Sequence, residues 1–469
     1  MSEVQESIDQ LRERYAAFGQ GHVFRFWDSL DSGARSALVA QARNVDLPEL
    51  RRMHEHTRKL AAPGSRTLAP VAIERLPERG GSSERRAAAR KRGEELLNAG
   101  RVAVMVVAGG QGTRLGFPGP KGAFPLGPAS GRTLFELYAE KLRGARRRHR
   151  TAIPWYVMTS PATDAATRVF FEERAWLGLP RGDVMFLCQA MLPALDLEGR
   201  LILEAPDRNA ESPNGPGGAF QALADSGALD DMARRGISTI SYFQVDNPMI
   251  RLADPLFLGL HELEGAEMSC KVVSKLDPME KVGVVAHVDG RIGIVEYTEI
   301  DDAHRNARDA SGELVYWAGS IAIHALDVGF ARRVAARADA LLPYHASAKK
   351  IPCVDASGRS QSPAQPNGHK LERFLFDALP AAERVAVLEV ERSEEYAPVK
   401  NAEGSDSPAT ARAALDAQAR SWLAAGGLDG PRGAWVEVDH ARIDSEEDAR
   451  ESGIRSISDP AIRTAPRGL

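Results

Sequence analysis

Two periods of apolar and polar positions run along most of this chain and predict its elements. An uninterrupted, β-branched apolar run at 102–108 predicts a strand buried on both faces, and further strands are predicted at 153–158, 184–188, 236–245, 268–274 and 385–390. Apolar residues at helical spacing predict helices at 88–99, 133–148, 162–173, 253–264 and 409–425. Regular alternation of strand and helix predicts an α/β fold, with a mixed, mainly parallel sheet flanked by helices.

The pattern changes in three regions, which predicts more than one domain. Residues 1 to about 60 are charged and helical, and a Pro-, Gly-, Ser- and Arg-rich stretch from Ala62 to about Arg86 is typical of a linker. Strands at 268–274, 282–288 and 292–297 follow one another across short turns, which predicts an antiparallel excursion. We expect three parts: a helical region with linker (1–90), the main α/β domain (91–380) and a small C-terminal domain (381–469).

Composition excludes several classes of protein. The chain has 469 residues and a formal net charge of −4, which argues against a nucleic-acid-binding surface. Its three cysteines are scattered, which suits a reducing compartment, and no His or Cys cluster has the spacing of zinc ligands. No apolar run approaches the length of a membrane span. We therefore expect a cytoplasmic protein without nucleic-acid or membrane partners.

A glycine-dense loop follows the first strand, in the sequence VAVMVVAGGQGTRLGFPGPKGAF. Gly109, Gly110 and Gly112 let the main chain approach a ligand, and successive N–H groups of such a loop bind anionic oxygens. Arg114 and Lys121 add two cations. Together these features predict a polyphosphate site, the alternative being a tight strand–helix connection.

Two better-known glycine motifs do not fit this loop. A P-loop ends in Gly-Lys-Ser/Thr, whereas Lys121 is followed by Gly122. A dinucleotide fingerprint has a third glycine where this chain has Leu115, and no ribose-binding acid follows at the usual interval. A nicotinamide-dependent dehydrogenase is therefore disfavoured.

Two further stretches bring polar groups to strand or helix ends. Asp246 and Asn247 end the strand at 236–245, where a carboxylate holds Mg²⁺ against phosphates or, alternatively, caps the next turn. The glycine-rich sequence PNGPGG (213–218) precedes a helix, whose N-terminus favours negative charge.

The C-terminal half contributes two lysines of interest. In QPNGHKLERFLFDAL, helical spacing of four apolar residues predicts a helix, and Lys370 lies beside its Pro-Asn-Gly turn; the four residues are Leu371, Phe374, Leu375 and Ala378. Lys400 lies in a proline-flanked loop. Taken alone, both lysines are ordinary solvated side chains.

With these motifs in order, the chain resembles the eukaryotic-type UDP-N-acetylhexosamine pyrophosphorylases, within the UDP-sugar pyrophosphorylase group. The resemblance covers nearly the whole length and rests on blocks in family order: FRFWDSL, AGGQGTRLGFPGPKG, PNGPGG, VDNPMIRLADPLFLG, KVGVVAHVDGRIGIVEYTEI, LPYHASAKKIPCVD, PNGHKLERFLFD and APVKNAEGSDSPATAR. It implies a Rossmann-like nucleotidyltransferase fold of the GT-A-like kind, with the catalytic domain at 91–380.

The resemblance also implies a role for each matching residue. It implies a catalytic set of Arg114, Lys121 and Lys400, and Asp246 as the ligand of Mg²⁺. It implies nucleotide contacts from Ala108, Gly109, Gly110, Gln111, Gly112, Thr113, Gln189, Asn214, Gly215, Gly217 and Gly218. It implies contacts to the sugar and its phosphate from Asn247, Gly283, Glu296, Ser320 and Lys370.

The implied reaction joins UTP to a sugar 1-phosphate, N-acetylglucosamine 1-phosphate first among them, and forms a UDP-sugar and pyrophosphate. One departure concerns the sugar: Gly319-Ser320 stands where the family usually has Gly-Asn. A UDP-glucose or broad-specificity pyrophosphorylase and a non-catalytic UDP-sugar-binding protein are the alternatives. A glycosyltransferase normally has an acid pair after its strand, where this chain has Asp246-Asn247-Pro248. Oligomeric state does not follow from the sequence.

Overall fold

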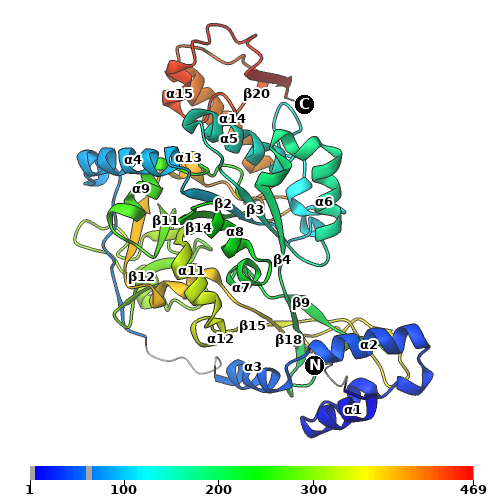
Figure 1. The fold of residues 1–469 in the computed structure, drawn as a ribbon. Helices are drawn as coiled ribbons and strands as arrows, with labels where there is room; N and C mark the ends of the chain where they lie inside the picture. Colours follow the sequence, from blue (N-terminus) through cyan, green and yellow to red (C-terminus); the bar gives the residue numbers. More distant parts are fainter. Residues whose placement is uncertain (1–5, 60–65, 468–469) are drawn as a thin grey trace. The chain divides into compact units, whose positions relative to one another are not determined.

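The computed structural model describes residues 6–59 and 66–467 (Figure 1). The chain forms two compact units, each built from three stretches: unit 1 contains 1–65, 190–218 and 342–375, and unit 2 contains 66–189, 219–341 and 376–469. The beginning of the expected linker, 62–65, lies outside the described residues. The division at residues 90 and 380 stays a prediction.

Unit 2 is organised around one large sheet. Among the described residues this sheet has ten strands, with the order β1-β12-β14-β10-β2-β3-β4 and with β11, β13 and β19 paired beside that path. The strands are β1 (Leu68–Ala69), β2 (Val102–Val107), β3 (Trp155–Thr159), β4 (Val184–Cys188), β10 (Thr239–Gln244), β11 (Met268–Ser274), β12 (Val284–Val288), β13 (Arg291–Val295), β14 (Ala318–Asp327) and β19 (Val385–Glu389).

Strand β2 is central because both of its faces are buried. Val104 and Val106 belong to the core on one face, and the intervening Ala103 and Met105 are fully buried on the other. The strands β10, β2, β3 and β4 run parallel, whereas β14 and β12 run antiparallel to their neighbours. The predicted mixed α/β sheet and the antiparallel excursion of β11–β13 are therefore confirmed.

Helices cover both faces of this sheet, with α4 and α9 on one side and α7, α8 and α11 on the other (Figure 1). Helix α5 begins with a capping box between Thr133 and Glu136, as expected for a Thr-x-x-Glu start. The helices are α4 (Ser83–Asn98), α5 (Leu134–His149), α6 (Asp164–Glu173), α7 (Gly218–Asp225), α8 (Ala228–Arg234), α9 (Pro255–Leu263), α10 (Asp302–Asn306), α11 (Val328–Ala335), α12 (Ala338–Leu341), α13 (Arg392–Glu395), α14 (Pro408–Ala425) and α15 (Glu446–Glu451).

The last part of unit 2 carries its own small core. Strands β20 (Ala434–Val438) and β21 (Ile462–Pro466) pair antiparallel, and with α15 they pack on α14 around Trp422 and Val436. We call residues 434–467 the C-terminal segment.

Unit 1 combines helices with short antiparallel ladders. Helices α1 (Ile8–Ala17), α2 (Ser32–Asn44) and α3 (Leu47–Lys59) confirm the predicted helical N-terminal region. The strands are β5 (Met191–Pro193), β6 (Leu195–Asp196), β7 (Leu203–Ala205), β8 (Arg208–Asn209), β9 (Glu211–Pro213), β15 (His345–Lys349), β16 (Cys353–Val354), β17 (Ser360–Gln361) and β18 (Gly368–Glu372). Leu11, Tyr15 and Leu371 share one core in this unit.

The helix predicted from Leu371 to Ala378 is wrong. Leu371 lies instead in β18, which pairs with β15, and a 3-10 helix follows at Leu375–Ala381. A Cβ on Gly368 would lie 2.3 Å from the carbonyl oxygen of Leu195, so the strand packs directly on a neighbouring main chain. Strand pairing, which a local helical pattern cannot anticipate, decides the conformation here.

No helix among the described residues is long and apolar enough to cross a membrane.

Candidate active site

The loop that follows β2 presents unpaired N–H groups. Gly112 N–H donates to the Gly119 carbonyl (2.8 Å) and Lys121 N–H to the Gly110 carbonyl (3.0 Å), which closes the loop into a compact turn. Within the described part of the chain, the N–H groups of Gly109, Gly110 and Gln111 donate no hydrogen bond. A Cβ on Gly110 would meet nothing within 4 Å, so this side of the loop is open. Three successive free amides at an open loop are suited to anionic oxygens.

Gln189 lies directly beside this loop. A Cβ on Gly109 would lie 2.4 Å from the Gln189 side-chain nitrogen, so only glycine lets the two approach. Ser160 donates its hydroxyl to the Gly109 carbonyl (2.7 Å) and fixes the loop from below. Gln189 is 5 % exposed, and its Oε1 is buried without a hydrogen-bond partner among the described residues. The free amides and this unpaired acceptor are polar groups with which a ligand can pair.

Asp246 lies at the same edge of the sheet as the glycine loop. Strand β10 pairs parallel with β2, and Val245 N–H donates to the Val107 carbonyl (3.0 Å), so the two strands end side by side. Lys121 Nζ lies 3.9 Å from Asp246 Oδ2, and both side chains are largely buried. The topology of neighbouring parallel strands therefore joins a cation and a carboxylate from distant parts of the sequence.

Lys400 joins this pair from a third segment. Val399 N–H donates to the Asp246 carbonyl (2.8 Å), and Lys400 Nζ donates to the Tyr396 hydroxyl (3.3 Å). Burial opposes the charged form of Lys400, but Tyr396, Asp246 and Asp406 outweigh it and raise its pKa. Burial lowers the pKa of Lys121, Asp246 opposes this shift, and Lys400 and Arg114 add to it. The charges of Asp246, Lys400 and Arg114 therefore all act on Lys121, and these predicted charged residues lie in one neighbourhood.

One of these charged groups, the Asp246 carboxylate, is suited to holding a cofactor metal. Mg²⁺ is usually held by one or two carboxylates together with substrate phosphates and water. Asp246 supplies one carboxylate next to the free amides, and the described residues contain no cluster of three or more His, Cys, Asp or Glu that could enclose a metal by themselves. The donor set thus suits a metal shared with a phosphate ligand.

Three of the residues expected at the sugar lie together along the same sheet. Ser320 N–H donates to the Gly283 carbonyl (2.8 Å), and a Cβ on Gly283 would lie 3.4 Å from Glu296 Oε1. Ser320 lies near the start of strand β14. Because β14 runs antiparallel to β10, Ser320 lies toward the edge of the sheet at which β10 ends. Their roles toward a sugar stay a prediction.

The second glycine loop, 213–218, and Lys370 lie in unit 1. Asn214 N–H donates to the Ala190 carbonyl (3.1 Å), and Gly217 N–H donates to the Arg373 carbonyl (2.7 Å), which fixes the second glycine loop. Gly215 has a φ of +81°, which favours glycine. Asn214 Oδ1 is buried without a hydrogen-bond partner among the described residues, and Lys370 lies on β18. Their part in nucleotide or sugar binding stays a prediction.

Asn247 has its side chain engaged within the protein. Its amide nitrogen donates to the Glu395 carbonyl (2.7 Å), and its oxygen accepts the N–H of Ala397 (3.2 Å) and of Met249 (3.3 Å). In this structure Asn247 therefore ties the Asp246 loop to the segment that carries Lys400. A direct sugar contact by Asn247 stays a prediction.

Sequence reasoning missed two groups that support the site. Tyr396, whose hydroxyl accepts from Lys400, carries no motif that marks it in advance. Lys141 lies one helical turn from Tyr138 on the buried face of α5 and is 2 % exposed. A lysine inside an apolar stripe was the available signal, since lysine is almost never fully buried without a partner.

The chain is similar to known proteins over most of its length. Residues 58–407 match the family model described as UTP–glucose-1-phosphate uridylyltransferase. The chain is 41% identical to UDP-N-acetylhexosamine pyrophosphorylase-like protein 1 of Homo sapiens, covering 92% of this chain and 88% of the human one. It is 34% identical to UDP-N-acetylglucosamine pyrophosphorylase of Saccharomyces cerevisiae, covering 92% and 94%. The solved uridine diphosphate N-acetylglucosamine pyrophosphorylase of Trypanosoma brucei matches with a TM-score of 0.78 at 30% identity, covering 89% and 86%.

Proposed function

This chain belongs to the UTP–glucose-1-phosphate uridylyltransferase family and is a nucleotidyltransferase, and we propose that its substrates are UTP and N-acetylglucosamine 1-phosphate. An oxygen of the sugar phosphate attacks the α-phosphorus of UTP, the bond to the β-phosphate oxygen breaks, and pyrophosphate leaves. The products are UDP-N-acetylglucosamine and pyrophosphate. The observation that carries the proposal is the convergence of Lys121, Asp246 and Lys400 beside the free amides of the glycine loop.

Positioning and charge stabilisation are the main demands of this reaction. The sugar phosphate is already ionised at neutral pH, so no general base is required, but two anions must be held together. The free amides of 109–111 bind phosphate oxygens, and Arg114 and Lys121 offset the charge that develops on pyrophosphate. Lys400 compensates the incoming sugar phosphate. Gln189, with its unpaired Oε1, accepts a hydrogen bond from the uracil ring.

Asp246 is the residue that would hold Mg²⁺ in this proposal. When bound, the ion supplies charge neutralisation and fixes the orientation of two phosphate groups. Lys121 and Asp246 lie close together without a short hydrogen bond, at 3.9 Å. Asp246 therefore keeps its oxygens available for a metal, while Lys121 stays within reach of the same phosphates.

Pyrophosphate release from UTP and Mg²⁺, measured across a panel of sugar 1-phosphates, tests this function. We expect release with N-acetylglucosamine 1-phosphate at a kcat/KM on the order of 10⁴ M⁻¹s⁻¹ or more, in the usual range of enzymes. Binding of UDP-N-acetylglucosamine without any release of pyrophosphate would instead identify a non-catalytic UDP-sugar-binding protein.

Glucose 1-phosphate is the second candidate substrate, because Ser320 is shorter than the asparagine usual at this position. We expect Ser320→Asn to raise the preference for N-acetylglucosamine 1-phosphate over glucose 1-phosphate by roughly tenfold, since one restored hydrogen bond contributes about 0.5–1.5 kcal/mol. The ratio of the two kcat/KM values measures this. An identical ratio in wild type and variant would remove Ser320 from sugar selection.

A further inference from the structure

Side chains of helix α5 donate hydrogen bonds to the segment that carries Asp246. Tyr138 donates its hydroxyl to the Val245 carbonyl (3.0 Å). One turn later, Lys141 Nζ donates to the carbonyls of Pro248 (3.0 Å) and Ile250 (2.8 Å). Two side chains of one helix thus hold three carbonyls that flank Asp246 on both sides.

The Asp246 segment packs into the main core and borders a cavity on one side. Met249 and Arg251 line a cavity of about 470 Å³, which Lys141 also borders. The hydrogen bonds from Lys141 hold the main chain of the segment at the wall of this cavity. Loss of these donors leaves the carbonyls of two buried residues, Pro248 and Ile250, without their side-chain partner, which costs more than the loss of an exposed hydrogen bond.

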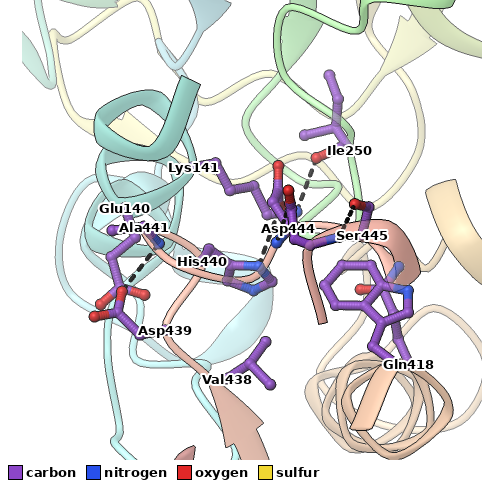
Figure 2. A network of polar contacts seen from close by, with 12 residues as sticks. Glu140, Lys141, Ile250, Gln418, Val438, Asp439, His440, Ala441, Asp444 and Ser445 are labelled. Atoms are coloured by element: carbon purple, nitrogen blue, oxygen red, sulfur yellow. Dashed lines mark hydrogen bonds and ion pairs between the residues drawn. The ribbon is translucent and has the colours of Figure 1, made fainter. Parts of the chain in front are cut away.

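The C-terminal segment provides the counter-charge for Lys141. In Figure 2 the ammonium end of Lys141 points toward both Ile250 and Asp444. Burial lowers the pKa of Lys141, and Asp444 is first among the acidic groups that oppose this, ahead of Glu395 and Glu394. Asp444 is itself buried, and its carboxylate is paired with His440 Nδ1 at 3.1 Å.

A second contact anchors the C-terminal segment to α5. Arg463 pairs with Glu140 (2.8 Å), the residue next to Lys141, and also with Glu437 (3.1 Å) of β20. Glu140 is fully buried. Helix α5 is therefore bound to the C-terminal segment through Glu140, and to the Asp246 segment through Tyr138 and Lys141.

We propose that Lys141 is a positioning residue for Asp246, and that Asp444 of the C-terminal segment keeps Lys141 in this role. The proposal rests on the proposed function, because it assigns Asp246 to the reaction. It gives the C-terminal segment a part in activity: through Asp444 and Lys141, it sets the conformation of the segment from Asp246 to Asp254.

Four variants test the proposal: Lys141→Met, Asp444→Asn, the double variant, and Lys91→Met as a control on the exposed side of α4. Lys141→Met keeps the length of the side chain and removes its donors. We expect amide hydrogen exchange in 246–254 to become about tenfold faster in Lys141→Met and about threefold faster in Asp444→Asn, with exchange in β2 unchanged. The double variant is expected to match Lys141→Met, because Asp444 acts through Lys141. The control should match the wild type.

Kinetics separate a positioning role from a purely structural one. For Lys141→Met we expect kcat to fall by roughly tenfold or more while both KM values stay within about twofold, because binding groups elsewhere are untouched. Unchanged exchange in 246–254 would overturn the proposal, and so would faster exchange with an unchanged kcat. If Lys141→Met does not fold, Asp444→Asn carries the same two measurements. If the wild-type protein releases no pyrophosphate, the proposed function fails, whereas the exchange data still decide whether Lys141 orders this segment.

Discussion

Lys121→Ala is expected to lower kcat by about 10²–10³-fold, or roughly 3–4 kcal/mol, the usual effect of removing one group that stabilises transition-state charge. Lys121 is the cation that lies closest to Asp246 in the described site, at 3.9 Å, and the charges of Arg114 and Lys400 also act on it. The variant should fold, because the Lys121 ammonium donates no hydrogen bond among the described residues and lies 3.9 Å from its nearest carboxylate oxygen. Single-turnover measurements of pyrophosphate release provide the test.

The pH dependence of the wild type gives an independent check on Lys121. Burial lowers its pKa, so the protonated form is lost at a lower pH than for an ordinary lysine. The alkaline limb of kcat/KM is therefore expected to begin below the usual lysine range, and it should be absent from Lys121→Ala. Lys91→Ala, on an exposed part of α4, serves as the control. Wild-type turnover in Lys121→Ala would refute the assignment.

Asp246→Asn is expected to reduce activity by about 10³-fold or more at ordinary Mg²⁺ concentrations, because a neutral amide is a poor ligand for a hard cation. The main-chain bond from Val399 N–H to the Asp246 carbonyl does not depend on the side chain, so the loop should keep its conformation. Rates measured as a function of Mg²⁺, together with Mn²⁺ binding in the presence of UTP followed by electron paramagnetic resonance, report the two effects separately.

A surface carboxylate supplies the control for this second variant. Asp230→Asn removes an equal charge at an exposed pair with Arg332 and should leave rate and metal binding unchanged. A fully active Asp246→Asn protein with an unaltered Mg²⁺ dependence would exclude Asp246 as the metal ligand.

Much of the sheet could be predicted from local pattern. Strands β4 and β11 begin and end at their predicted residues, and β2 lies one residue inside its predicted range. The apolar run of β2 is informative because a strand buried on both faces admits almost no polar side chain. The glycine loop was equally readable, since glycine clusters mark close main-chain approach.

Local pattern failed where pairing across the chain overrides it. The apolar spacing from Leu371 to Ala378 predicts a helix, yet β18 forms because β15 and β6 supply its partners. Unit 1 brings together three stretches that are far apart in the sequence, 1–65, 190–218 and 342–375. Conformation in such places depends on contacts between residues far apart in the chain, which propensity does not contain.

The sequence by itself determined which chemical groups this protein carries and the strand ends at which they stand: the glycines after β2, Arg114, Lys121 and Asp246. Only the tertiary structure decided that Lys121, Asp246 and Lys400 meet, that Tyr396 and Asn247 join their segments, and that Lys141 holds the Asp246 segment from α5. The physical reason is that a residue's charge and flexibility are local properties, whereas its distance to another group is set by the packing of the whole sheet.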